Sequence, residues 1–268
     1  MQSKVKILYF CPNTKNFMTK LALITGASSG IGEATARKLA ALGYDLVLTA
    51  RRAERLERLA AELRTAHGVE VQNLIFDVRD EKACEEYLAQ ISTERPIDVL
   101  VNNAGLAAGL EHIDAGSTED WNAMIDTNIK GLLYVTRIIS RRMIEAGRGH
   151  IVNLGSIAGT QPYENGAVYC ASKHAVHAIS QSMRSDLVAH GIKVSEVRPG
   201  MVETEFSVVR FHGDEERAKG VYKGVTPLTG SDIAEVIGWI VSQPAHVNID
   251  DVLITPQQQA NAYHTVRK

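Results

Sequence analysis

The chain has 268 residues, of which 45% are hydrophobic and 22% are charged, and its formal net charge is −2. This length and composition favour one large globular domain, and the near-neutral charge argues against a general nucleic-acid-binding protein. No apolar run approaches the roughly 20 residues that a membrane-spanning helix needs, and the three scattered cysteines suit a reducing compartment. We therefore expect a cytoplasmic protein with neither nucleic acid nor membrane among its partners.

Residues 1–17 differ in composition from the rest of the chain. They contain three lysines, no acidic residue and one apolar run, residues 7–11, which is short and lacks the small-residue cleavage site of a signal peptide. Met18 directly precedes the first convincing strand. We interpret residues 1–17 as a dispensable extension, with a short added edge strand as the alternative, and residues 18–268 as a single domain.

From Lys20 onward, short apolar runs alternate with segments of helical periodicity. Strands are predicted at residues 21–25, 45–50, 69–76, 97–102, 149–154, 192–198 and 252–254. Helices are predicted at residues 31–42, 53–67, 81–91, 117–146, 168–179 and 231–241. This alternation is typical of an α/β fold, a Rossmann-type doubly wound parallel sheet of about seven strands with helices on both faces. Such sheets bind ligands beyond the carboxyl ends of their strands, so polar motifs that directly follow strands are candidate functional residues.

A glycine-rich loop with the pattern T-G-x-x-x-G-x-G joins the first strand to the first helix. Glycines here allow a tight turn and a close approach of the backbone to a pyrophosphate, whose charge the helix N-terminus stabilises. The predicted cofactor contacts of this loop are Gly26, Ser28, Ser29, Gly30, Ile31 and Gly32.

Two arginines, Arg51 and Arg52, follow the second strand. An acidic residue at this point would hydrogen-bond the ribose hydroxyls of NAD, whereas arginines suit the 2′-phosphate of NADP. The alternative is that both arginines begin the solvated face of the next helix. Because cations at a helix start oppose the helix dipole, an anionic ligand explains the pair better, and the sequence favours NADP.

Three polar residues lie around the end of the fifth strand and on the helix that follows. Ser156 comes directly after a buried run, and Tyr169 and Lys173 are spaced to share one face of a helix. A free tyrosine titrates near ~10, and a fixed cation nearby favours the phenolate and lowers that pKa. Ser156 would hold a substrate oxygen while Tyr169 exchanges a proton with it. The Tyr169–Lys173 spacing alone is equally that of an ordinary amphipathic helix.

Together these motifs resemble those of the short-chain dehydrogenase/reductase family, over about residues 19–254. The family motifs occur here in the family's order: the glycine loop, the N-N-A-G run of Asn102–Gly105, the residues Asn128, Ser156, Tyr169 and Lys173, and the P-G pair at Pro199. The resemblance implies an NADP-binding catalytic domain that transfers a hydride to or from the nicotinamide.

The resemblance also implies a role for each member of the tetrad. Tyr169 would be the general acid/base, Ser156 would orient the carbonyl or alcohol, and Lys173 would lower the pKa of the tyrosine and hold the nicotinamide ribose. Asn128 shares a helix face with Trp121, so this amide lies in an apolar stripe that also contains Ile125, Leu132 and Val135. Buried polar groups need partners. The family's asparagine anchors a water that extends the proton relay, and a purely structural asparagine is the alternative.

Further cofactor contacts follow from the same resemblance. Asp77 and Val78 would lie beside the adenine, unless Asp77 or Asp80 only caps the next helix. Thr204 would meet the nicotinamide carboxamide. The remaining implied contacts are Asn103, Ala104, Gly105, Pro199, Gly200 and Val202.

Several stretches resemble one branch of the family, the NADP-dependent 3-hydroxy acid dehydrogenases that oxidise L-serine, L-allo-threonine and 3-hydroxyisobutyrate. They are residues 103–109, 119–121, 124–128, 204–211 and 244–249. This likeness implies a homotetramer or homodimer, and no cluster with metal-ligand spacing calls for a metal. The alternatives are an NADP-dependent reductase of 3-oxoacyl thioesters, ketones, aldehydes or sugars with the same tetrad, and a non-catalytic NADP-binding protein.

A 3-hydroxy acid requires a cation or amide donors for its carboxylate. Arg210, in the loop after the sixth strand, is predicted to be that clamp, with a lid-stabilising surface arginine as the alternative. Gln161 and Tyr163, shortly after Ser156, are predicted to line the substrate pocket together with Ser156 and Tyr169.

Overall fold

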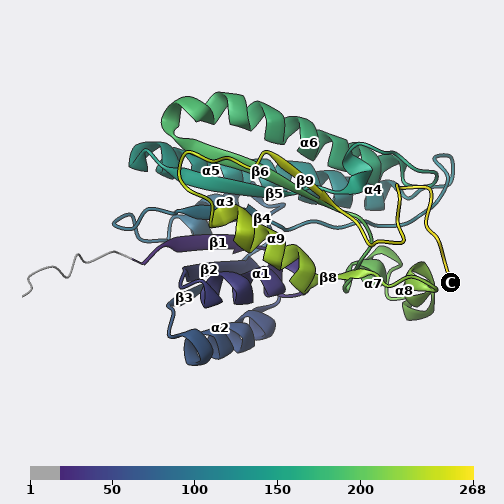
Figure 1. Ribbon diagram of the computed structural model, residues 1–268, viewed down its shortest axis with the longest axis horizontal. Helices are drawn as coiled ribbons and strands as arrows, with labels where there is room; N and C mark the ends of the chain where they lie inside the picture. Colours follow the sequence, from purple (N-terminus) through teal and green to yellow (C-terminus); the bar gives the residue numbers. More distant parts are fainter. Residues whose placement is uncertain (1–18) are drawn as a thin grey trace, which may run out of the picture.

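The computed structural model describes residues 19–268 (Figure 1). The expected extension, residues 1–17, lies outside the described residues. The centre of the fold is a parallel sheet of seven strands, as the sequence predicts, and the strand order is β3-β2-β1-β4-β5-β6-β9. The strands are β1 (Leu21–Thr25), β2 (Asp45–Ala50), β3 (Val71–Ile75), β4 (Val99–Asn102), β5 (Gly149–Leu154), β6 (Ile192–Pro199) and β9 (Asp251–Ile254).

The central strands are largely hydrophobic because helices cover both faces of the sheet. Every residue of β1 and β2 is buried, which explains why these strands appear as continuous apolar runs rather than alternating ones. β1 pairs in parallel with β2 on one side and with β4 on the other. The strand order therefore reverses after β3, when the chain crosses to the other side of β1 to form β4. Ligand sites are expected at the carboxyl ends of β1 and β4, where this reversal occurs.

Two helical layers enclose the sheet. One core cluster joins it to α1 (Gly30–Ala41), α2 (Ala53–His67) and α9 (Gly230–Val241). The second cluster joins the opposite face to α3, α5 and α6. The bounds on that side are α3 (Glu81–Leu88), α4 (Thr118–Ile125), α5 (Leu132–Ala146) and α6 (Ala167–Leu187), with single turns of 3₁₀ helix at Ile157–Gly159 and Val188–His190. None of the described helices is long and apolar enough to cross a membrane.

The long helix predicted over residues 117–146 is interrupted. Between α4 and α5 the backbone takes π-helical geometry over Asp126–Gly131, the segment that contains Asn128. Single π turns inside α-helices are frequently found at functional sites. Ser117 caps the helix start by accepting a hydrogen bond from the N–H of Asp120, as its sequence pattern predicts. Other element ends differ from prediction by a few residues, as expected at frayed ends, except that α6 continues for two turns beyond residue 179.

The segment after β6 has structure where only a loop was expected. Two short parallel strands, β7 (Val202–Glu203) and β8 (Leu228–Thr229), enclose α7 (Phe206–Arg210) and α8 (Glu215–Tyr222). This insertion projects to one side of the sheet, and the C-terminal end of the chain returns to it (Figure 1). Arg267 Nη1 donates hydrogen bonds to the carbonyls of Val221 and Lys223, which ties the tail to the insertion.

Candidate active site

A cleft of about 660 Å³ opens at the carboxyl ends of the strands. It brings together most of the residues singled out from the sequence, from segments far apart in the chain. Those that line it are Gly26, Ser28, Ser29, Gly30, Ile31, Arg51, Arg52, Asp77, Val78, Asn103, Ala104, Gly105, Ser156, Tyr163, Tyr169, Lys173, Pro199, Gly200, Val202, Thr204 and Arg210. Three predicted residues, Gly32, Asn128 and Gln161, are not among the lining residues.

The glycine loop is fixed by close backbone contacts. Gly26 has a φ of +66°, and a Cβ atom there would lie 2.9 Å from the Cα of Ala104. A Cβ at Gly32 would lie 2.4 Å from Asn103 Nδ2, so this glycine packs the loop rather than lining the cleft. Ser29, before α1, makes no side-chain capping bond, which leaves the first N–H groups of the helix available to an anion.

The N-N-A-G run joins β4 to its neighbours. Asn103 Nδ2 donates hydrogen bonds to the carbonyls of Thr25, at 2.8 Å, and Gly26, at 3.1 Å. Thr25 Oγ1 accepts from the backbone N–H groups of Asn103 and Ala104. Asn102 Nδ2 donates to Asn153 Oδ1 at 2.9 Å and so links β4 to β5. These amides hold the two loops on either side of the cleft in register.

Arg52 reaches into the glycine loop. Its Nη2 donates to Ser29 Oγ at 2.7 Å and its Nε to Ser28 Oγ at 3.2 Å. Its Nη1 forms an ion pair with Glu205 at 2.9 Å, and Arg55 pairs with the same carboxylate at 2.6 Å. The cationic corner beyond β2 therefore includes Arg55, which the sequence analysis did not identify.

Asp77 is not a helix cap. The side chain of Asp80 accepts the N–H of Ala83 and caps α3 instead. Asp77 lines the cleft and accepts hydrogen bonds from Arg79, and Arg51 lies 3.7 Å from it. Burial by itself would raise the pKa of Asp77, but the hydrogen bonds and charge of Arg79 and the charge of Arg51 hold that pKa below its ordinary value.

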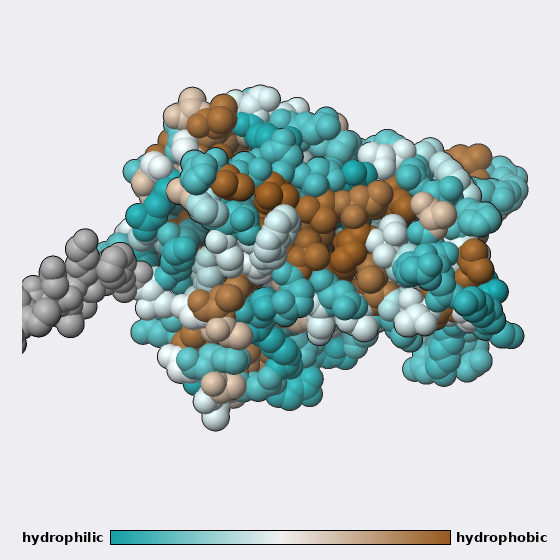
Figure 2. All heavy atoms as spheres, viewed as in Figure 1, coloured by the Kyte–Doolittle hydropathy of each residue, from teal (hydrophilic) through white to brown (hydrophobic). Residues whose placement is uncertain are grey.

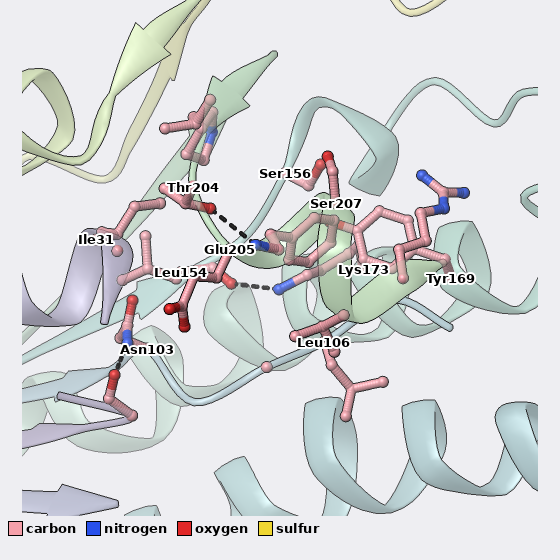
Figure 3. Close-up of a pocket in the computed structure, with 18 of the residues that line it drawn as sticks. Ile31, Asn103, Leu106, Leu154, Ser156, Tyr169, Lys173, Thr204, Glu205 and Ser207 are labelled. Carbon is pink, nitrogen blue, oxygen red and sulfur yellow. Dashed lines mark hydrogen bonds between the residues drawn. The ribbon is translucent and has the colours of Figure 1, made fainter. Parts of the chain in front are cut away.

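The three residues expected to carry the chemistry converge on one part of the cleft (Figure 3). Ser156, directly after β5, is 8% exposed, and Tyr169 and Lys173, on successive turns of α6, are 9% and 7% exposed. Lys173 Nζ donates to the carbonyl of Leu154 at 2.8 Å. The Ser156 hydroxyl accepts from the N–H of Ala158 at 3.1 Å, so the serine is positioned by the turn that follows β5.

Burial has the largest effect on the protonation of Tyr169 and Lys173. Burial raises the pKa of its phenol well above the ordinary value, and only the Ser156 hydroxyl and the Arg210 charge act in the opposite direction. Burial also lowers the pKa of Lys173 to about 8, against the field of Glu196. Burial dominates the pKa of both groups, and the expectation that Lys173 lowers the tyrosine pKa stays a prediction.

Asn128 does not line the cleft but hydrogen-bonds residues next to it. It is 2% exposed; its Oδ1 accepts from the N–H of Leu106, and its Nδ2 donates to the Leu106 carbonyl and to Ser172 Oγ at 3.0 Å. A Cβ at Gly105 would lie 3.2 Å from Asn128 Oδ1 and 3.7 Å from Lys173 Nζ, so only this glycine separates the two side chains. Ile125, predicted on the same buried face, is 37% exposed because the π-helical turn shifts the face that points inward.

Arg210 is at the end of α7 and points toward the tyrosines. Its guanidinium carbon lies 5.7 Å from the ring centres of both Tyr163 and Tyr169. Its Nε donates to the carbonyl of Gly109 at 3.1 Å, whereas its Nη2 is buried and has no hydrogen-bond partner among the described residues. Gln161 was expected to line the substrate pocket, but its Oε1 accepts the N–H of Ala262 and holds the C-terminal tail.

The C-terminal tail forms a wall of the cleft that the sequence analysis missed. Gln259 Oε1 accepts the N–H of Met201 at 2.8 Å, which anchors the tail beside the P-G segment. No motif in this polar tail distinguishes it from an ordinary chain end. The tail residues that line the cleft are Gln259, Ala262, Tyr263, Thr265 and Arg267.

Comparisons with known proteins agree with this geometry. The family model described as short chain dehydrogenase matches residues 20–214. The chain is 46% identical to the NADP-dependent 3-hydroxy acid dehydrogenase YdfG of Salmonella typhi, over 92% of this chain and 99% of that protein. It is 45% identical to serine 3-dehydrogenase of Agrobacterium fabrum, over 91% of this chain and 97% of that protein. It is also 45% identical to sulfoacetaldehyde reductase 2 of Chromohalobacter salexigens, over 91% and 96% respectively.

A solved structure of similar shape is the closed form of serine dehydrogenase complexed with NADP⁺. It superposes with a TM-score of 0.86 at 43% sequence identity and covers 92% of this chain and 99% of that one. Fold, motif order, site geometry and sequence identity over almost the whole length all agree. The chain therefore belongs to the short-chain dehydrogenase family.

Proposed function

We propose that this protein is an NADP-dependent oxidoreductase that interconverts small 3-hydroxy acids, of the L-serine, L-allo-threonine and 3-hydroxyisobutyrate class, with the corresponding 3-oxo acids. The observation that carries this proposal is the half-buried Arg210 beside Tyr169, whose buried Nη2 has no partner in the described part of the chain. A substrate carboxylate would supply that partner. The names of the relatives above support the same substrate class.

The residues of the cleft fit NADP. The glycines let the loop pack closely against Asn103, Ala104 and Thr204, and the uncapped start of α1 suits a pyrophosphate. Arg51 and Arg52 would hold the 2′-phosphate, and Thr204 would contact the nicotinamide end. NADP, when bound, supplies the hydride acceptor or donor.

The remaining chemistry belongs to this chain's own residues. Arg210 would bind the substrate carboxylate and so place the 3-hydroxyl between Ser156 and Tyr169. Ser156 would hold that hydroxyl oxygen while Tyr169 takes its proton during oxidation and returns it during reduction. Lys173 would hold the ribose and, through its charge, stabilise the phenolate as it forms. Asn128 fixes the backbone beside the lysine.

A substrate that carries a sulfonate is the second candidate. A relative named sulfoacetaldehyde reductase 2 matches almost the whole chain, and a planar guanidinium can hydrogen-bond a sulfonate much as it does a carboxylate. Reduction of a small anionic aldehyde would use the same Ser156, Tyr169 and Lys173. Uncharged ketones and 3-oxoacyl thioesters would leave Arg210 unpartnered and are expected to be poor substrates.

Initial rates with a panel of substrates test the assignment. NADP⁺ reduction would be followed with L-serine, L-allo-threonine, 3-hydroxyisobutyrate, 3-hydroxybutyrate and 2-propanol, and NADPH oxidation with sulfoacetaldehyde. Turnover of the hydroxy acids with NADP⁺ and not with 2-propanol is the expected result. Turnover confined to sulfoacetaldehyde would favour the second candidate, and turnover confined to uncharged alcohols would contradict both.

We also propose that the protein forms a homodimer or homotetramer in the cytoplasm. Strand β9 lies at the edge of the sheet and leaves Leu253 44% exposed, while Trp239 of α9 is 52% exposed. A broad apolar area lies in the middle of the face shown in Figure 2, around the position of β9 in Figure 1. An uncovered edge strand with apolar side chains favours pairing with a second copy. Light scattering of the purified protein would give the oligomer size.

A further inference from the structure

Glu196 is a buried carboxylate for which the reaction described above has no use. It lies on β6 and is 1% exposed. Its Oε2 is 2.6 Å from His177 Nδ1, whereas its Oε1 is buried and has no hydrogen-bond partner in residues 19–268. A buried acid that is only half satisfied is costly to fold, so its presence calls for a physical reason.

Glu196 lies on the strand next to β5, close to the backbone segment that leads into Ser156. It faces Asn153 in the parallel register of β5 and β6. A Cβ on Gly155 would lie 2.1 Å from Glu196 Oε1, so the carboxylate occupies the space where a side chain at Gly155 would be. Gly155 stands between Leu154, whose carbonyl accepts Lys173 Nζ, and Ser156. The free oxygen therefore lies against the short segment that positions both the lysine and the serine.

The partner of Glu196 comes from the same helix as the lysine. Lys173 and His177 are one turn apart on α6 and face the sheet together. His177 donates to or shares a proton with Glu196 and thereby fixes the carboxylate between the helix and β6. Burial lowers the pKa of Lys173, and among residues 19–268 the charge of Glu196 acts in the opposite direction.

Burial raises the pKa of Glu196, and two other charged groups, Asp251 and Arg198, act on that pKa in opposite directions. Asp251 of β9 lies 3.7 Å from His177 Nδ1, but Arg198 of β6 pairs with Asp251 at 2.8 Å. The three possible ligands His177, Glu196 and Asp251 lie within 4.8 Å of one another, yet the Arg198 guanidinium occupies the place where a cation would neutralise Asp251. Glu196 is therefore the negative charge that acts on Lys173 from the other side of Gly155.

We propose that Glu196, held in place by His177, is a positioning residue for the reaction: its carboxylate is the counter-charge that keeps the buried Lys173 protonated. This inference rests on the proposed function only in that it treats Lys173 as the residue that holds the ribose and stabilises the phenolate. Loss of the carboxylate removes a negative charge close to Lys173, and removal of a negative charge lowers the pKa of any nearby acid.

The test is the pH dependence of a Glu196→Gln variant, which keeps the volume and a hydrogen bond to His177 but removes the charge. Two quantities would be measured between pH 6 and 10: kcat/KM for NADPH-dependent reduction, and the Kd of NADPH from its fluorescence without substrate. We expect the alkaline midpoint of both profiles to fall by about 0.5–1 pH unit, because a nearby carboxylate favours the charged form of the ammonium and its loss removes that effect. His177→Leu, which removes the donor that fixes the carboxylate, is expected to shift both midpoints in the same direction.

Asp45→Asn is the matched control. Asp45 is also a buried carboxylate, 7% exposed and paired with Arg95 at 2.6 Å, but it lies at the opposite end of the sheet from the cleft. Its loss is expected to lower the melting temperature and leave both midpoints unchanged.

Unshifted midpoints in Glu196→Gln and His177→Leu, with a lower melting temperature alone, would overturn the proposal and leave Glu196 a structural residue. If Glu196→Gln does not fold, His177→Leu decides the matter. Because NADPH binding is measured without substrate, an incorrect substrate assignment would not affect this result.

Discussion

The guanidinium carbon of Arg210 lies 5.7 Å from the ring centre of Tyr169, although the two residues come from different elements, α7 and α6. Its Nη2 points into a buried space with no partner among the described residues. The arrangement brings a fixed cation to the residue expected to exchange the proton, and one group can therefore both bind an anionic substrate and oppose the effect of burial on the pKa of Tyr169.

Arg210→Ala is expected to raise KM for L-serine or 3-hydroxyisobutyrate by roughly 10–100-fold, because a charge-assisted hydrogen bond contributes about 1.5–3 kcal/mol. Steady-state kinetics would measure the change. The matched control is Arg217→Ala, since Arg217 is exposed and packs over Phe211 at 4.4 Å rather than over the tyrosines. An unchanged KM for the acids in Arg210→Ala would assign this arginine to lid stabilisation instead.

Arg52→Ala is expected to weaken NADP⁺ binding by about 10-fold or more while the affinity for NAD⁺ stays the same, because only NADP⁺ carries the 2′-phosphate. The ratio of kcat/KM for the two cofactors is the measurement. Arg58→Ala, an exposed arginine further along α2, serves as the control and should not change that ratio. Equal losses for both cofactors in Arg52→Ala would mean that the arginine only holds Ser28 and Ser29.

Tyr169→Phe is expected to lower kcat by about 10²–10⁴-fold, the usual contribution of a positioned acid/base group. NADPH binding should persist, because the ring keeps its packing in a buried cluster with Ala107 and Met124. Single-turnover kinetics and fluorescence titration would separate the two effects. Retention of full turnover would disprove the catalytic assignment of Tyr169.

Gly32→Ala is expected to destabilise the protein by about 1–3 kcal/mol, since its Cβ would meet Asn103 Nδ2 and the Gly26 carbonyl, each at 2.4 Å. Loss of the Asn103 hydrogen bonds should also weaken NADP⁺ binding. Gly220→Ala, in helix α8 with nothing near the added Cβ, should instead be neutral or stabilising by about 0.5–1 kcal/mol. Chemical denaturation of both variants would check the contrast.

The buried His150 should make the fold sensitive to acid. Burial lowers the pKa of His150 to about 3, and its Nε2 lies 2.8 Å from Ser195 Oγ. Between the unfolded pKa near ~6.5 and the folded value, the unfolded chain binds the extra proton, so stability is lost as the pH falls through this window. His150→Asn is expected to reduce the loss between pH 7 and 5 by about 1–2 kcal/mol, as measured by urea denaturation. His67→Gln, at an exposed position at the end of α2, should leave the loss unchanged.

Much of the fold was predictable because its signals are local. Apolar runs such as residues 21–25 and 45–50 can only be the buried strands of a covered sheet, and their alternation with helices fixed the parallel topology. The insertion after β6 was not predictable in the same way. Its short helices α7 and α8 have few buried residues of their own and depend on contacts with the cleft and the C-terminal tail.

The residues of the candidate site also differ in whether local sequence patterns could predict them. The glycine loop, Ser156, Tyr169 and Lys173 could be found from sequence because each carries its own spacing rule and follows a recognisable strand or lies on one helix face. Gln161 was misplaced, since nothing near it in the sequence indicates that its amide would bind Ala262 of the tail. Asp77 was ambiguous until the structure gave the helix cap to Asp80.

The sequence by itself determined the fold class, the cofactor loop and the residue types available for proton transfer, because these depend on short-range periodicity and on steric rules for single residues. Only the tertiary structure decided which groups, far apart in the sequence, lie together in the same partly buried site. It placed Arg210 over Tyr169, Glu196 beneath Gly155 and the C-terminal tail along the cleft wall. The pKa of Tyr169 rises and that of Lys173 falls to about 8 because burial in the folded chain removes them from water, and burial is a property of the whole packed molecule.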